Sequence, residues 1–148
     1  MQASFTTTEF GDEARSLAAA LEGRLLQDPS YLFGEVVLRR PDAAPVTIPD
    51  DLQFPIPDLC AEATATLRQG GPAAVSLVDW ANTIQLAVEG DDIRLTDSMG
   101  ADSSFPRDDL IEALRGCGGR FADFLAALGV TNPDWAAQAT QLRAALAA

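Results

Sequence analysis

The stretch from Val75 to Asp97 constrains the fold more than any other part of the chain. Its apolar residues recur at every second position, the period of a β-strand with one apolar and one polar face. The alternating positions are Ile84, Leu86, Val88, Ile93 and Leu95. Between the two runs, Gly90-Asp91-Asp92 has the composition of a tight hairpin turn. With the run that begins at Val75, the pattern predicts a three-stranded antiparallel meander over residues 75–97, whose apolar face needs a cover.

Four further segments have the 3.6-residue period of amphipathic helices. They cover about residues 9–27, 58–69, 106–128 and 133–146. The β-branched and aromatic residues between Tyr31 and Ile48 predict a second pair of strands, a hairpin over residues 31–48. The three prolines that follow predict a surface loop over residues 49–57, in which Asp50 and Asp51 face water.

Together these elements predict an α+β fold. We expect a single domain over residues 1–148, in which an antiparallel sheet (meander 75–97 plus hairpin 31–48) is covered on one face by the helices. Residues 1–8 are polar and are expected to be frayed. The C-terminal helical region, residues 130–148, is expected to be mobile or to form an interface.

The charge of the chain bears on its partners. There are 22 acidic side chains against ten arginines, with no lysine and no histidine, so the formal net charge is −12. Such a surface repels phosphate backbones, which argues against nucleic-acid binding and favours a basic protein partner. Solubility alone explains the charge equally well. No apolar run is long enough to span a bilayer and no signal sequence precedes the first helix, so we expect a cytoplasmic protein without a membrane partner.

The missing residue types exclude much enzymatic chemistry. Without histidine there is no triad built on that base, and without lysine there is neither Schiff-base chemistry nor a phosphate-loop motif. Cys60 and Cys117 lie in predicted helices and lack the spacing of a zinc or dithiol site, so two buried free thiols are favoured over a disulfide. We therefore expect no catalytic residue, no cofactor and no metal.

Carboxylates are the remaining candidates for chemistry. Most of the acidic clusters coincide with a turn or with a helix start, where acids have a structural role, and none has the spacing of a calcium-binding loop. The clusters are Asp91-Asp92, Asp97 with Asp102, and Asp108-Asp109 with Glu112. A structural role for these acids is therefore favoured over metal binding.

Trp80 stands next to Asp79, near the end of a predicted strand. A tryptophan in a strand belongs more often to the core, and we favour a core position. The alternative is that the indole anchors a partner, as such rings do at interfaces.

Two stretches carry a resemblance to a known class of protein. They are DWANTIQLAVEGDDIRLTD, a short meander, and FPRDDLIEALRGCGGRFADFL, the amphipathic helix that follows it. In architecture they resemble the small acidic immunity proteins of bacterial secreted toxin systems. The resemblance implies a non-catalytic protein that is steered to a basic toxin and occludes its active site. The contact would be made by Asp50, Asp51, Asp91, Asp92, Asp97 and Asp102, with Trp80 as a further candidate.

Three alternatives stay open. Chaperones of type III secretion systems are similar in size, acidic and α+β, but the predicted order of two strands, a helix and then three strands departs from the usual order of that family. A small hydrolase that relies on carboxylates alone is the second alternative. The third is a domain that dimerises through its final helix, so the chain is expected to be a monomer or a homodimer.

Overall fold

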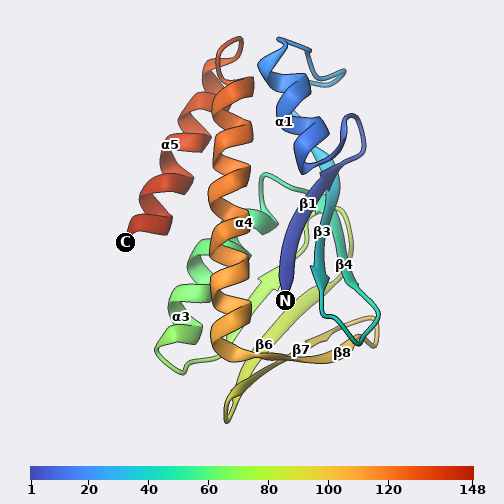
Figure 1. Cartoon of the computed structure of the whole chain (residues 1–148), viewed down its shortest axis with the longest axis vertical. Coiled ribbons are helices and arrows are strands. Elements are labelled where there is room, and N and C mark those ends of the chain that lie inside the picture. The colour runs from blue at the N-terminus through green and yellow to red at the C-terminus, as the bar shows by residue number, and fades with distance from the viewer.

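The computed structural model describes all 148 residues and contains two four-stranded antiparallel sheets, with strand orders β2-β1-β3-β4 and β5-β6-β7-β8. The fold is α+β, as the sequence predicts. Figure 1 shows the long helix α4 running along most of the molecule, past both sheets, with α5 returning beside it. The elements are β1 (Gln2–Thr7), β2 (Gly11–Asp12), α1 (Glu13–Leu21), β3 (Phe33–Arg39), β4 (Val46–Asp51), α2 (Pro55–Pro57), the π-helix η1 (Asp58–Ala63), α3 (Thr64–Arg68), β5 (Ala73–Ser76), β6 (Thr83–Glu89), β7 (Asp92–Asp97), β8 (Asp102–Pro106), α4 (Arg107–Leu128) and α5 (Pro133–Ala147).

One core joins the two sheets. A continuous cluster of 35 buried residues includes side chains from both sheets and from every major helix. At the first sheet, Phe5 of β1 packs edge to face on Phe121 of α4, with ring centroids 5.1 Å apart. At the second sheet, Leu95 and Phe105 are buried in the same cluster as the N-terminal half of α4. Because α4 supplies apolar side chains to both sheets, neither sheet has a core of its own.

The predicted meander is confirmed as β5, β6 and β7, in register from Ile84 opposite Asp97 to Glu89 opposite Asp92. Four of its five alternating residues are buried, and Val88 is half-buried. The predicted hairpin is confirmed as β3 and β4, but it belongs to a separate sheet. The sequence did not predict β8, in which Phe105 is the only large apolar side chain.

Residues 1–8 are not a frayed end, because β1 pairs with β3 along its whole length. Ala3, Phe5 and Thr7 alternate with more exposed residues and point inward. β1 has the same two-residue period as the meander, but its polar composition makes this period hard to recognise in the sequence. The N-terminus is thereby part of the first sheet.

The first helix is shorter than the predicted range 9–27. It begins at Glu13, because Asp12 caps it by accepting a hydrogen bond from the Arg15 amide at 2.9 Å. The residues that it buries are small (Ser16, Ala19 and Ala20). Leu21 and Leu25, which an amphipathic helix over residues 9–27 would place on its apolar side, are 71% and 70% exposed. Small side chains on the inner face allow α1 to pack close to its neighbours.

The helix predicted from residue 58 begins earlier, at Pro55, and passes through the π-helical segment η1 before it becomes α3. The hydroxyl of Thr64 donates to the carbonyl of Cys60 at 2.8 Å, which satisfies an acceptor in the widened segment. Cys60 and Cys117 are buried free thiols, as predicted. A hydrogen bond with Cys117, together with burial, raises the pKa of the Cys60 thiol well above its usual value.

The last two helices lie where the sequence predicts them. Trp135, Ala139 and Leu142 are buried, so the apolar side of α5 lies within the fold, and α5 packs chiefly on α4. The glycines of α4 do not interrupt it. No helix of the chain is both long enough and apolar enough to cross a bilayer.

Two adjacent glycines of α4 provide a test of this packing. A Cβ added at Gly119 meets no atom within 4 Å, so we expect Gly119→Ala to raise the free energy of unfolding by about 0.5 to 1 kcal/mol through helix propensity. A Cβ added at Gly118 would lie 2.9 Å from the Cβ of Cys60. We expect Gly118→Ala to lower the free energy of unfolding by about 1 to 3 kcal/mol through overpacking. Urea unfolding measures both, and equal effects would contradict the close contact of α4 with η1.

Candidate functional site

Several of the predicted contact residues lie around one connection, the loop of residues 77–82 between β5 and β6. Asp50, Asp51 and Asp97 hold this loop and its neighbours, and Trp80 is part of it. Asp91 and Asp92 lie at the opposite end of β6, in its turn to β7. The sequence placed these acids in one group because of their charge. The structure separates them into acids near the 77–82 loop and acids at the β6–β7 turn.

Asp50 does not face water, as the sequence predicted, but is fully buried at the end of β4. Its two carboxylate oxygens accept hydrogen bonds from the amides of Val78 at 2.9 Å and Asp79 at 2.8 Å. A buried carboxylate needs such donors, because its charge has lost the hydration of water. The side chain therefore ties the first sheet to a loop of the second sheet, the connection between β5 and β6.

Asp51 is also buried, contrary to the prediction, and it holds the segment before β3. It accepts hydrogen bonds from the Leu32 amide at 3.2 Å and from the Gln53 side chain at 2.8 Å. Burial raises the pKa of the Asp51 carboxyl, although these hydrogen bonds oppose the shift. The Gln53 amide group also donates to the Ser30 carbonyl at 2.9 Å, so the chain on either side of Tyr31 is fixed.

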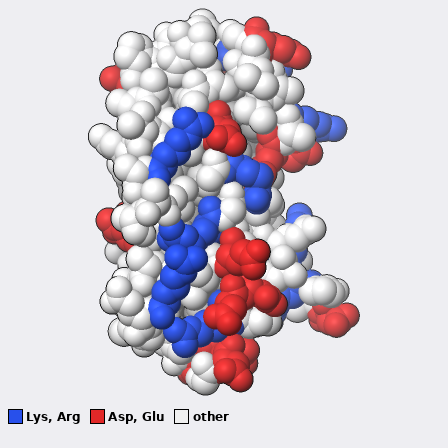
Figure 2. Space-filling model, turned by 60° about the vertical axis from the view of Figure 1, so that its left-hand side comes forward, with Lys and Arg blue, Asp and Glu red and all other residues white.

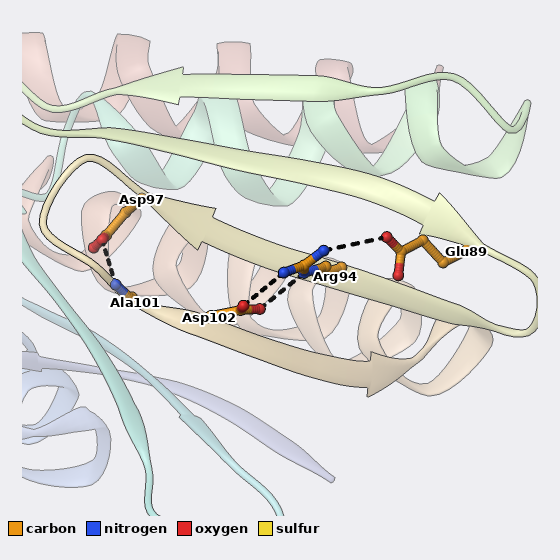
Figure 3. A network of polar contacts seen from close by, with 5 residues as sticks. All are labelled: Glu89, Arg94, Asp97, Ala101 and Asp102. Carbon is orange, nitrogen blue, oxygen red and sulfur yellow. Dashed lines mark hydrogen bonds and ion pairs between the residues drawn. The ribbon is translucent and has the colours of Figure 1, made fainter.

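Asp97 organises the adjacent turn between β7 and β8. One of its oxygens accepts from the amides of Met99 at 2.9 Å and Ala101 at 2.8 Å, the second of which is drawn in Figure 3. Its other oxygen accepts from the side chain of Asn82 at 3.1 Å, which links this turn to the 77–82 loop. Burial opposes ionisation, but the hydrogen bonds from Ala101, Asn82 and Met99 prevail and lower the pKa of Asp97.

These anchored loops display a group of exposed apolar and aromatic side chains. Tyr31, Val78 and Trp80 are 38%, 57% and 48% exposed, so Trp80 is not the core residue that the sequence favoured. The hydroxyl of Tyr31 donates to Asp79 at 2.5 Å, which fixes the ring beside the loop. This hydrogen bond is the main reason why the pKa of Tyr31 is raised to about 12. We call six exposed residues of these loops and of the turn after β4 the loop surface: Tyr31, Phe54, Val78, Asp79, Trp80 and Met99.

Asp102, the last predicted contact residue, lies on the open face of the second sheet. Arg94 of β7 donates to its two oxygens at 2.9 and 2.6 Å, and Glu89 lies 3.8 Å from the same arginine (Figure 3). The guanidinium lowers the pKa of Asp102, and the two acids raise that of Arg94. Asp102 is thus paired within the chain, whereas Asp91 and Asp92 are exposed and form no ion pair.

A large hollow of the surface lies elsewhere and is polar. It measures about 730 Å³ between β1 and the N-terminal half of α4. There Glu13 accepts from the Phe5 amide at 3.1 Å, and Arg120 donates to the Ala3 carbonyl at 2.7 Å. Glu13 and Arg120 also pair with each other at 2.7 Å. These contacts satisfy the free edge of β1, which would otherwise offer a template for another strand.

The loop surface exposes apolar and aromatic side chains on loops that buried or hydrogen-bonded carboxylates hold in place. The carboxylates that anchor these loops, Asp50, Asp51 and Asp97, accept from neutral donors. No three or more His, Cys, Asp or Glu side chains of the chain are grouped so that they could hold a metal ion. No known protein family, curated protein or solved structure matches the chain.

Of the loop surface, sequence analysis predicted only Trp80 and missed Tyr31, Phe54, Val78, Asp79 and Met99. The one available signal was the segment Val78-Asp79-Trp80-Ala81-Asn82, in which the two-residue period of the flanking strands is lost. The hydrogen bond from Tyr31 to Asp79 joins residues 48 positions apart, and no local pattern indicates it.

Replacement of Asp50 tests whether it is an anchor. In Asp50→Asn, one of the two acceptor oxygens becomes a donor that faces a backbone amide, so we expect the free energy of unfolding to fall by about 2 to 3 kcal/mol. The matched control is Asp91→Asn, at an exposed site, which we expect to change it by less than about 0.5 kcal/mol. Urea unfolding gives both values, and hydrogen exchange should quicken at Val78 and Asp79. A small effect at Asp50 would contradict its role as an anchor.

Tyr31 is the only tyrosine, so its ionisation can be followed by absorbance. We expect a midpoint near pH 12 in the wild type, because the bond to Asp79 favours the neutral phenol. In Asp79→Asn the midpoint should fall toward the ordinary value of about 10. A folded-state pKa above the unfolded value stabilises the fold below about pH 10, and this contribution is lost as the pH rises toward 12. Circular dichroism at each pH shows that the fold persists, and equal midpoints in the two folded proteins would contradict the bond.

Proposed function

We propose that this chain is a non-catalytic binding module that recognises another protein through the loop surface. The observation that carries the proposal is the position of the exposed apolar side chains. Of the eight large apolar side chains that are exposed, five belong to the loop surface. They are Tyr31, Phe54, Val78, Trp80 and Met99. Exposed apolar patches of this kind are typical of interaction sites.

The loop surface is also fixed before binding. Asp50, Asp51 and Asp97 hold the backbone of three of its four loops through hydrogen bonds, so a partner need not immobilise them. Pre-organisation of this kind increases affinity because less conformational entropy is lost on association. Tyrosine and tryptophan supply a large contact area at a small entropic cost, and they are enriched among the residues that dominate binding energy.

The charge of the chain points to a basic partner. Asp79 lies within the loop surface and Asp91 and Asp92 lie at the far turn of the second sheet, so these acids act at different distances. An acid that touches the partner, such as Asp79, contributes to affinity. Acids outside the contact, such as Asp91 and Asp92, chiefly accelerate association by electrostatic steering. The specific form of the proposal is an immunity protein, whose loop surface covers the active site of a basic secreted toxin. Its binding epitope is then Trp80 and Asp79 rather than the buried Asp50 and Asp51.

The test starts with capture of the partner from the organism that encodes the chain, followed by binding measurements with the purified pair. We expect Trp80→Ala to weaken binding by at least about 30-fold, the effect of losing a central aromatic anchor. The matched control is Leu25→Ala, another exposed apolar residue but outside the loop surface, which should not alter the affinity. Charge reversal of Asp91 and Asp92 should slow association at low salt and leave the dissociation rate unchanged.

The immunity form requires one more result. The captured protein should be toxic when it is expressed alone, and co-expression of this chain should protect the cell, with loss of protection in Trp80→Ala. A partner that binds as an unfolded segment, indifferent to Trp80, would favour a secretion chaperone instead. Turnover of a substrate without any protein partner would overturn the proposal.

A further inference from the structure

The exposed face of α4 and its neighbours carries two groups of opposite charge side by side. Figure 2 shows basic side chains in a row along the long axis of this face, with acidic side chains gathered beside the lower half of the row. The chain has no lysine, so every basic side chain in this view is an arginine. Arg107 donates to the carbonyl of Arg68, and the charge of Arg68 acts on Arg115, so these three arginines lie close together and we call them the basic row. Asp109 and Glu112, which line the polar hollow between β1 and α4, are called the acidic row.

Two arginines of the basic row, Arg107 and Arg115, are held by neutral acceptors, whereas the side chain of Arg68 is exposed. Arg107 donates to the carbonyls of Leu67 at 3.1 Å and Arg68 at 2.9 Å, at the C-terminal end of α3. Its Nε is enclosed by the protein and has no hydrogen-bond partner. Arg115 donates to the Thr64 hydroxyl at 3.1 Å and to the Leu146 carbonyl. None of the three forms an ion pair, so their charge is not neutralised within the chain.

The acidic row is equally unpaired, although partners are near in sequence. Glu112 and Arg115 have the i, i+3 spacing that favours an ion pair on a helix, but Arg115 points toward Thr64 and Leu146 instead. Asp109 and Glu112 are themselves three residues apart, and like charges at this spacing repel. Repulsion is present in the basic row as well, where burial and the charge of Arg68 lower the pKa of Arg115.

We propose that this face binds a second copy of the same chain, with the basic row of each copy on the acidic row of the other. In such a dimer the twofold axis runs parallel to α4 and passes between the two rows. Rotation about it places the basic row of one copy opposite the acidic row of the other, and each residue keeps its position along the helix axis. Arg115 of one copy then lies about 4.5 Å along the axis from Glu112 of the other, at a rise of about 1.5 Å per residue, within reach of an arginine side chain. Each contact is made twice in such a dimer.

Charge complementarity selects this occupant over others. A uniformly acidic partner, such as a nucleic acid, would neutralise the basic row and be repelled by the acidic row. A uniformly basic partner would neutralise the acidic row and be repelled by the basic row. A complementary face needs an acidic row opposite the basic row and a basic row opposite the acidic row. A second copy of the chain, turned about the twofold axis, provides both. The dimer leaves the loop surface as a separate site, so this inference goes beyond the proposed function.

The oligomeric state and its response to charge reversal test the proposal. In sedimentation equilibrium at low salt we expect twice the 15.6 kDa mass of the chain, with dissociation as salt screens the pairs. Arg68→Glu and Glu112→Arg should each weaken the dimer about tenfold or more, because each change converts two symmetric attractions into repulsions. Both side chains are exposed and form no hydrogen bond or ion pair within the chain, so the fold should be retained, which thermal melting checks.

Mixing the two variants gives the decisive result. A copy with Arg68→Glu has added negative charge and a copy with Glu112→Arg has added positive charge, so an equimolar mixture should form a heterodimer more readily than either variant self-associates. The matched controls, Arg39→Glu and Glu22→Arg, carry the same charge changes on other exposed parts of the chain and should leave the dimer intact, as should Trp80→Ala. A wild-type chain that stays monomeric at its highest soluble concentration in low salt would overturn the proposal. A dimer that is indifferent to both reversals, or a mixture that does not associate, would overturn it too.

Discussion

The carboxylate of Asp50 connects the two halves of this molecule in a way that apolar packing alone does not. It is fully buried, forms no ion pair and accepts two backbone hydrogen bonds from the loop between β5 and β6. The helix α4 brings the two sheets together through a shared core, but a core fixes no particular loop conformation. A buried charge does so, because each of its oxygens must keep its donor or lose the free energy of a charged hydrogen bond. The hydrogen bonds to Asp50 therefore fix the conformation of the β5–β6 loop, which carries Val78, Asp79 and Trp80 of the loop surface.

This role changes the meaning of the negative charge. A net charge of −12 suggests a surface covered with acids that await a basic partner, yet many of these acids have partners within the chain. Asp12 caps α1, Asp97 closes a turn and Asp102 pairs with Arg94. The acids that can act on another molecule are those without such contacts, and their placement decides whether they touch it or only attract it. Position is thus more informative than the total charge.

Much of the architecture could be predicted from the sequence, because strong periodicity is a local property. The meander, the β3–β4 hairpin and the helices α4 and α5 were predicted at nearly their observed bounds. The errors arose where two local signals disagreed. Ile48, Asp50 and Leu52 follow the two-residue period, which places Asp50 on the buried face, but the prolines nearby and the charge itself indicated an exposed loop. The period was the correct signal, since β4 continues to Asp51.

The candidate site was less predictable than the fold, because it is built from contacts between distant residues. Trp80 could be recognised as a candidate anchor, but its exposure depends on how the loop is held from Asp50, 28 positions or more away. The carboxylates were chosen as contact residues, and the structure gives three of them the task of positioning Trp80 and its neighbours instead. The acids and the aromatic residues of this site thus have different roles. Acids whose charge is satisfied inside the chain hold the loops rigid, and the aromatic rings that they position are free to bury their area against another protein.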